Sequence, residues 1–378
     1  MCPCPKESVN FSTTDNIYIE GDNLKALQLL QEDYSRKIKM IYIDPPYNTG
    51  GNFIYADNFT SHAAWRDMMQ PRLALAADLL RDDGVIFISI DDHEVCNLRD
   101  ICNNVFGEEN FIAQLIWERA YAPKNDAKYI SNSHEYILMY AKAISHFVVG
   151  RLPRTNEANS RYKNPDNDPR GPWKAGDLSA KRYTPADIYP IKTPSGKLVW
   201  PPPGRSWRMS EKAFLEKQQA GRIWFGKDGG SVPQIKRFLC ELRHEGMAPQ
   251  SILFYKQVGH SQEGTKEVAA LLGANIFDGP KPVRLLNHLL LLANTTQDDI
   301  ILDFFSGSGT TAHAVMALNA KDNGRRRFIM VQTPQPCNER SEAFKKGYKN
   351  VCEIGKERIR RAGSAICQPD MGFRVYKI

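Results

Sequence analysis

The sequence has no long hydrophobic run, and this absence narrows the possible classes of protein. A stretch of about 18 apolar residues, the length that a membrane-spanning helix needs, does not occur. The first residues, Met1 to Lys6, lack the apolar core of a signal peptide. We therefore expect a soluble, cytoplasmic protein. Internal repeats and low-complexity tracts are also missing, which argues against a solenoid or a disordered chain.

Cysteine pairs with the spacing of metal ligands are missing as well. The eight cysteines are scattered, and none forms a Cys-x-x-Cys pair. Cys2 and Cys4 are too close together and too isolated to predict a metal site. We expect reduced, mostly structural thiols and no metal ion.

The composition fits a globular chain with one strongly basic segment. Of 378 residues, 42% are hydrophobic and 25% charged, which suits an α/β domain with a second module. The formal net charge is +7. Residues 151–250 hold 19 Lys and Arg against 10 Asp and Glu, a net of +9, so the other residues sum to −2. Four tryptophans interleave with these charges: Trp173, Trp200, Trp207 and Trp224. This pattern favours a module that contacts phosphates, although a solvated surface is the plain alternative.

The first chemical motif is Asp-Pro-Pro-Tyr, which follows the apolar run 39–43. We expect a buried strand that ends in a rigid loop. Pro45 and Pro46 have fixed φ angles and no N–H, so nearby backbone carbonyls are available to a ligand. Asp44 adds a carboxylate acceptor, and Tyr47 offers a ring on which a base could stack. These groups suit the exocyclic amino group of a nucleobase; a simple turn with a surface tyrosine is the alternative.

The second motif is a glycine turn after the expected strand 300–303. Phe305, Gly307 and Gly309 precede a helix of small residues, a pattern typical of a nucleoside cofactor site. A P-loop would need a lysine after the glycines, and a dinucleotide site would need a third glycine and an acid where Gln332 ends the next strand. A ribose and adenine without phosphates remain, which indicates S-adenosylmethionine. A tight turn with nothing bound is the plain alternative.

A third corner lies near the start of the chain. The expected strand 17–20 ends at Gly21, and apolar residues at helical spacing follow. Asp22 at this corner could accept a hydrogen bond from a bound nucleoside. It could equally cap the helix.

The strand and helix pattern changes between the two motifs, and this predicts three segments. Residues 1–150 and 271–378 alternate strands with helices, as in one α/β domain. Residues 151–270 are rich in proline and glycine, show no such alternation up to about Gln262, and indicate an insert with its own fold.

Together the two motifs resemble those of amino-methylating DNA methyltransferases, which carry Asp/Asn/Ser-Pro-Pro-Tyr/Phe and Phe-x-Gly-x-Gly. The order, with the catalytic motif first, a recognition insert between and the cofactor motif last, resembles the β class. Further segments resemble the modification subunits of type III restriction–modification systems: Gly21-Asp22-Asn23-Leu24, residues 43–50, residues 83–92, residues 355–362 and residues 372–376.

The resemblance implies a Rossmann-like, S-adenosylmethionine-dependent methyltransferase sheet: 1–150 the catalytic half, 151–270 the target-recognition insert, and 271–378 the cofactor-binding half. It implies base flipping, bacterial or phage origin, a homodimer, and a restriction subunit as a candidate partner. The implied catalytic residues are Asp44, Pro45, Pro46 and Tyr47. The implied cofactor residues are Asp303, Phe305, Gly307, Gly309, Asp22, Lys281 and Gln332; many relatives carry an acid where Gln332 stands.

The expected reaction is methylation of the N6 amino group of a flipped adenine in duplex DNA. Asp in the first position of the tetrapeptide favours adenine, but N4-methylation of cytosine remains an alternative. The sequence is also compatible with a catalytically idle DNA-recognition subunit and with an RNA methyltransferase.

Overall fold

The structure is a computed structural model that describes all residues except 52–53, 55–56, 126 and 367–370. The chain forms two compact units. Unit 1 comprises Met1–Leu152 and Ala248–Ile378, and unit 2 comprises Pro153–Met247. Residues 248–270, which the sequence pattern grouped with the insert, therefore pack in unit 1. Within the described ranges, no helix has the length and apolar character needed to cross a membrane.

A ten-stranded sheet forms the centre of unit 1. In sheet order its strands are β1 (Cys2–Pro3), β17 (Arg374–Lys377), β2 (Ile17–Glu20), β16 (Arg327–Gln332), β15 (Ile300–Asp303), β3 (Ile38–Ile43), β4 (Leu80–Ile90), β6 (His134–Ala141), β5 (Phe111–Glu118) and β14 (Ile252–Leu253). The strands from β17 to β4 are parallel to one another, whereas β1 is antiparallel to β17 and β6 is antiparallel to both β4 and β5.

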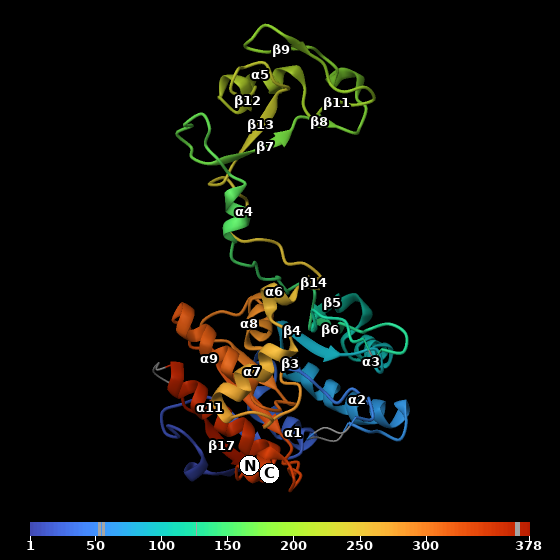
Figure 1. The fold of residues 1–378 in the computed structure, drawn as a ribbon, viewed down its shortest axis with the longest axis vertical. Coiled ribbons are helices and arrows are strands. Elements are labelled where there is room, and N and C mark those ends of the chain that lie inside the picture. The colour runs from blue at the N-terminus through green and yellow to red at the C-terminus, as the bar shows by residue number, and fades with distance from the viewer. Residues whose placement is uncertain (52–53, 55–56, 126, 367–370) are drawn as a thin grey trace. The chain divides into compact units, whose positions relative to one another are not determined.

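Helices cover both faces of this sheet (Figure 1), which confirms the predicted α/β architecture. The helices of unit 1 are α1 (Asn23–Tyr34), α2 (His62–Leu79), α3 (Val95–Phe106), α6 (Tyr255–Val258), α7 (Ser261–Leu272), α8 (Val283–Leu292), α9 (Thr310–Asp322), α10 (Glu342–Lys345), α11 (Val351–Ile366) and the 3-10 turns η1 (Pro5–Glu7) and η2 (Glu108–Asn110). One apolar core lies between the sheet and α8, α9 and α11, and the other between the sheet and α1, α2 and α3.

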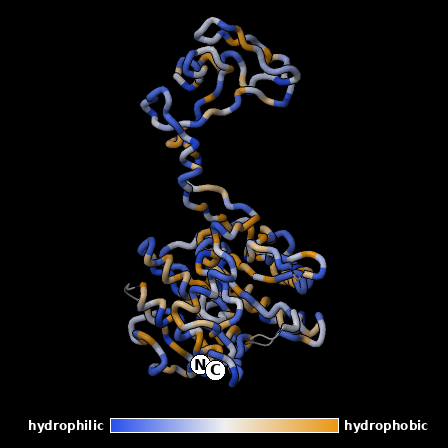
Figure 2. Tube along the Cα trace, in the orientation of Figure 1, coloured by the Kyte–Doolittle hydropathy of each residue, from blue (hydrophilic) through white to orange (hydrophobic). Residues whose placement is uncertain are grey.

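The central strands are buried on both faces, and their sequences explain why. All six residues of β3 are buried, and so is the run Val85–Ile90 of β4. These runs are apolar except for Lys39 and Ser89, and such sequences are typical of parallel strands covered on both sides. Figure 2 shows the corresponding hydrophobic trace through the interior of unit 1 and polar residues on its outer helices.

The sheet order brings the two motifs together. β15 pairs in parallel with β3, with Leu302 opposite Ile41. The carboxyl ends of these two strands therefore meet at one edge, where α/β sheets bind ligands. Asp44 follows β3 directly, and Phe305 follows β15 after one residue.

Unit 2 is a small α+β unit built from short elements. These are α4 (Asn156–Ser160), β7 (Trp173–Asp177), β8 (Ser179–Ala180), η3 (Pro185–Asp187), β9 (Ile191–Lys192), β10 (Leu198–Val199), β11 (Ser206–Trp207), α5 (Glu211–Gln219), β12 (Ile223–Trp224) and β13 (Gln234–Phe238). Trp207 lies in its apolar core, and Trp173 is buried against the edge of Trp224. Of the four tryptophans noted in the sequence, only Trp200 is exposed, so the others stabilise the unit.

Candidate active site

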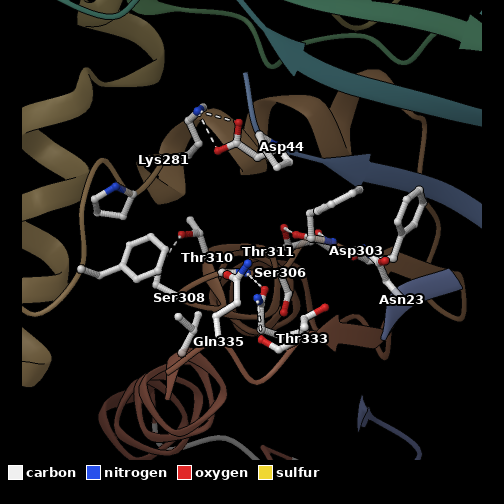
Figure 3. A pocket seen from close by; sticks show the side chains of 18 of the residues that line it. Asn23, Asp44, Lys281, Asp303, Ser306, Ser308, Thr310, Thr311, Thr333 and Gln335 are labelled. Carbon is white, nitrogen blue, oxygen red and sulfur yellow. Dashed lines mark hydrogen bonds and ion pairs between the residues drawn. The ribbon is translucent and has the colours of Figure 1, made fainter. Parts of the chain in front are cut away.

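A cavity of about 220 Å³ lies at the carboxyl edge of β3 and β15. Eight of the residues predicted from the sequence line it: Asp22, Asp44, Pro46, Lys281, Asp303, Phe305, Gly307 and Gln332. Three predicted residues do not line the cavity: Pro45, Tyr47 and Gly309. Pro45 and Gly309 are next in sequence to lining residues, and the Tyr47 hydroxyl donates a hydrogen bond to Asp44. Figure 3 shows the side chains of several lining residues converging on this cavity.

The Asp44 carboxylate is held by two neighbours. The Tyr47 hydroxyl donates to Asp44 Oδ1 at 2.7 Å. The Lys281 ammonium donates to Oδ1 at 2.9 Å and to Oδ2 at 2.7 Å (Figure 3). The Asp44 side chain is 28% exposed, so it stays open to the cavity. Burial raises the pKa of Asp44 while the Lys281 cation opposes that rise.

Lys281 lies in a cage of charges and rings. Its side chain is 9% exposed, and Nζ lies 3.2 Å from Glu135 Oε2 as well as next to Asp44. The same nitrogen lies 5.2 Å from the centre of the Tyr47 ring. The sequence predicted Lys281 as a cofactor residue, and that role stays a prediction. The observed contacts of its ammonium are with the Asp-Pro-Pro-Tyr loop and with Glu135.

The backbone carbonyls of Pro45 and Pro46 differ in whether a protein donor already occupies them. The Pro46 carbonyl accepts a hydrogen bond from the Trp65 indole at 2.7 Å, so it is not free as the sequence suggested. For the Pro45 carbonyl, the described residues supply no donor. Within this loop, the Pro45 oxygen and the Asp44 carboxylate are thus acceptors that a ligand can use.

The glycine turn is shaped by two residues with positive φ. Gly307 has φ +50° and Gly309 has φ +80°, and residues other than glycine rarely adopt these backbone angles. The Gly307 N–H donates to Gln332 Oε1 at 2.7 Å, so the side-chain amide at the end of β16 stabilises the turn. Gly309 then caps α9. A Cβ atom at Gly307 would lie 3.0 Å from the Phe277 ring, so the missing side chain lets this ring pack against the turn.

Two carboxylates face the cavity from other strand ends. Asp303 accepts hydrogen bonds from the Thr311 hydroxyl and the Phe305 N–H, and burial raises its pKa to about 7. Asp22 accepts from the Lys25 N–H at 3.0 Å, which is the helix cap that the sequence left open. It also lines the cavity, so capping and ligand binding are compatible at this position.

The cavity fits S-adenosylmethionine in its chemistry. Phe277, Phe305 and Val351 supply apolar walls, Asp22 and Asp303 supply carboxylates, and Gly307 contributes backbone to the lining. An adenine ring, ribose hydroxyls and an amino acid group need this combination of surfaces.

Sequence reasoning missed two residues that complete the charge cluster. Glu135 at the start of β6 is buried, its Oε2 lies 3.1 Å from the Tyr47 hydroxyl oxygen, and it pairs with Lys281. Arg119, just after β5, donates to Glu135 at 2.6 Å. Neither residue lies in a motif, and Glu135 resembled an ordinary strand position in the sequence.

Comparison with known proteins gives a consistent family. A family model described as DNA methylase matches residues 38–362. The chain is 36% identical to the type III restriction-modification enzyme StyLTI Mod subunit of Salmonella typhimurium, over 96% of this chain and 60% of that protein. It is 34% identical to the EcoPI Mod subunit of Escherichia phage P1, over 92% of this chain and 62% of that protein. It is 32% identical to the type II methyltransferase M.KpnI of Klebsiella pneumoniae, over 97% of this chain and 91% of that protein. The chain thus spans about three fifths of the length of the two Mod subunits.

Proposed function

Because the chain belongs to the DNA methylase family, we propose that it methylates the N6 amino group of a flipped adenine in duplex DNA. The methyl donor is S-adenosylmethionine. The observation that carries the proposal is the single cavity into which both the Asp44 carboxylate and the Gly307 turn open. One site can therefore hold the amino group and the methyl donor next to each other.

Asp44 and Pro45 would activate the target amino group. The lone pair of this nitrogen is delocalised into the base, so it is a weak nucleophile. Hydrogen bonds from its two hydrogens to Asp44 Oδ2 and the Pro45 carbonyl favour a tetrahedral nitrogen with a localised lone pair. When bound, S-adenosylmethionine supplies an electrophilic methyl group for in-line transfer. Asp44 can then accept the proton that the methylated nitrogen releases.

The other predicted residues would hold the cofactor and the base. Phe305, Gly307 and Gly309 form the turn around the cofactor, and Gln332 fixes that turn through the Gly307 N–H. Asp303 and Asp22 offer acceptors at two further points of the cavity. Tyr47 would stack on the flipped base, with its ring orientation set by the hydroxyl contacts to Asp44 and Glu135.

Unit 2 is the proposed target-recognition domain. Between Pro153 and Met247 it holds 18 Lys and Arg against 10 Asp and Glu, a net charge of 18 − 10 = +8. Tyr183 is 62% exposed and Trp200 is 55% exposed, so two aromatic rings accompany this positive surface. Positive charge with exposed rings favours contact with DNA phosphates and bases.

Mass spectrometry of nucleosides tests the proposal. Duplex DNA of mixed sequence is incubated with the chain and S-adenosylmethionine, digested and analysed for methylated bases. N6-methyladenine is the expected product. N4-methylcytosine would keep the mechanism and refute the choice of base.

An Asp44→Ala variant is the matched control for this experiment. It should lose turnover by about 10²–10³-fold because the amino group loses its charged acceptor. Binding of S-adenosylmethionine, measured by calorimetry, should remain. Cofactor binding without any methylated base from the unchanged chain would favour an idle recognition subunit instead.

A further inference from the structure

The Asp44 carboxylate has one unused acceptor position, and the network around Lys281 defines it. A carboxylate offers about four lone-pair sites. Oδ1 accepts from Tyr47 and Lys281, and Oδ2 accepts from Lys281 alone among the described residues. A target amino group can therefore bind Oδ2 while Lys281 stays in place.

The charges of this cluster balance in pairs. Lys281 bridges Asp44 and Glu135 at 2.7 Å and 3.2 Å, and Arg119 pairs with Glu135 at 2.6 Å. The side chains of Lys281 and Glu135 are 9% and 6% exposed, so water contributes little to stabilising their charges. Two cations and two carboxylates in contact give a local charge of zero.

We infer that Lys281, anchored by Glu135, is a positioning residue that keeps the Asp44 carboxylate charged and directs its free Oδ2 site at the amino group of the target base. This inference rests on the proposed function for its last step. Lys281 then acts on the recognition of the target base through Asp44, and Glu135 anchors Lys281.

The groups that face Asp44 determine the direction of each perturbation. Lys281 and Tyr47 stabilise its charged form, whereas Glu135 and the nearby Asp303 oppose it. Removing Lys281 leaves a cluster with a charge of −1, and removing the charge of Glu135 leaves +1. The first change favours a protonated Asp44 and the second favours an ionised one.

The experiment is the pH profile of kcat for three variants. The acidic limb of this profile is the fall of kcat at low pH, where Asp44 becomes protonated. In Lys281→Met this limb should move to higher pH by at least about one unit, and kcat should drop about tenfold for each pH unit below the new midpoint. Glu135→Gln should shift the limb downward. Lys281→Arg keeps the charge and should leave the limb close to that of the unchanged chain.

The opposite shifts separate this role from a purely structural one. Misfolding lowers kcat at every pH and leaves the limb where it was. The inference is refuted if both variants keep the original limb, or if Lys281→Met only weakens S-adenosylmethionine binding, which would make Lys281 a cofactor residue.

A titration without turnover separates the inference from the proposed function. The carboxyl carbon of Asp44 is followed by ¹³C NMR in the unliganded chain and assigned with Asp44→Asn. The midpoint should rise in Lys281→Met and fall in Glu135→Gln. If these midpoints move as expected but the unchanged chain methylates no DNA, the proposed function fails and the charge network stands. Unmoved midpoints would refute the network even in an active enzyme.

Discussion

Gly264 on α7 lets the loop that carries Lys281 lie directly against the helix. A Cβ atom at this position would lie 2.1 Å from the Pro280 carbonyl oxygen and 2.9 Å from the carbonyl carbon of Lys281. An ordinary C···O contact is about 3.3 Å, so Gly264→Ala requires a displacement of about 1.2 Å. The atoms involved are backbone, so no side chain can rotate to relieve the contact.

The displacement should weaken the hold of Lys281 on Asp44. The Nζ contacts of 2.7–2.9 Å to the Asp44 oxygens would lengthen towards or beyond hydrogen-bond range. A misplacement of about 1 Å in an active site costs on the order of 10²-fold in rate, and we expect that loss of kcat. Overpacking costs about 1–3 kcal/mol of the free energy of unfolding, which exceeds the gain of up to about 1 kcal/mol from replacing a helical glycine.

Methylation kinetics and thermal unfolding of Gly264→Ala test this reasoning. Thr265→Ala is the matched control, because Thr265 is the next residue of α7 and is exposed. Its loss of one local hydroxyl contact to Ser261 should leave kcat within about twofold of the original. A Gly264→Ala variant with full kcat and an unchanged or higher Tm would refute the steric argument.

Three further predictions concern the cavity and unit 2. Gln332→Ala removes the acceptor of the Gly307 N–H and should weaken S-adenosylmethionine binding about fivefold, a loss of about 1 kcal/mol measurable by calorimetry. Because the pKa of Asp303 is raised to about 7, the native state binds an extra proton between about pH 4 and 7, and the free energy of unfolding falls as pH rises through that window. Asp303→Asn should abolish this fall and raise the free energy of unfolding at pH 8 by at most about 4 kcal/mol; the same pH slope in the variant and the unchanged chain would contradict it. Duplex DNA binding should weaken at least about tenfold between about 50 and about 200 mM salt, and a flat salt dependence would argue against unit 2 contacting phosphates.

The strands and their terminal motifs were predictable from local sequence. β15 and β16 hold short apolar runs that end at Asp303 and Gln332, and β3 is apolar from Met40 to Ile43. Such local runs predict buried strands. The glycine turn also depends on local backbone conformation, because Gly307 and Gly309 have positive φ. The two motifs meet because β15 pairs in parallel with β3, and ligands bind at the carboxyl ends of such strands.

The extent of the insert was less predictable. Amphipathic helix α7 can bury its apolar face against any partner, so its sequence cannot show which unit it joins. Packing places it in unit 1, next to the Pro280 loop. The tryptophans of unit 2 show the same limit, because Trp173 and Trp207 fill apolar sites whose position only the folded chain defines.

By itself, the sequence determined the family and predicted the glycine turn and Asp44 as site residues, because each depends on residue types at short spacing. Only the tertiary structure decided what surrounds that acceptor. Lys281 lies 237 positions from Asp44 in the chain, and Tyr47 lies 88 positions from Glu135. Contacts at such separation follow from how strands and loops pack, and no local pattern encodes them. The charge balance around Asp44 is therefore a property of the fold.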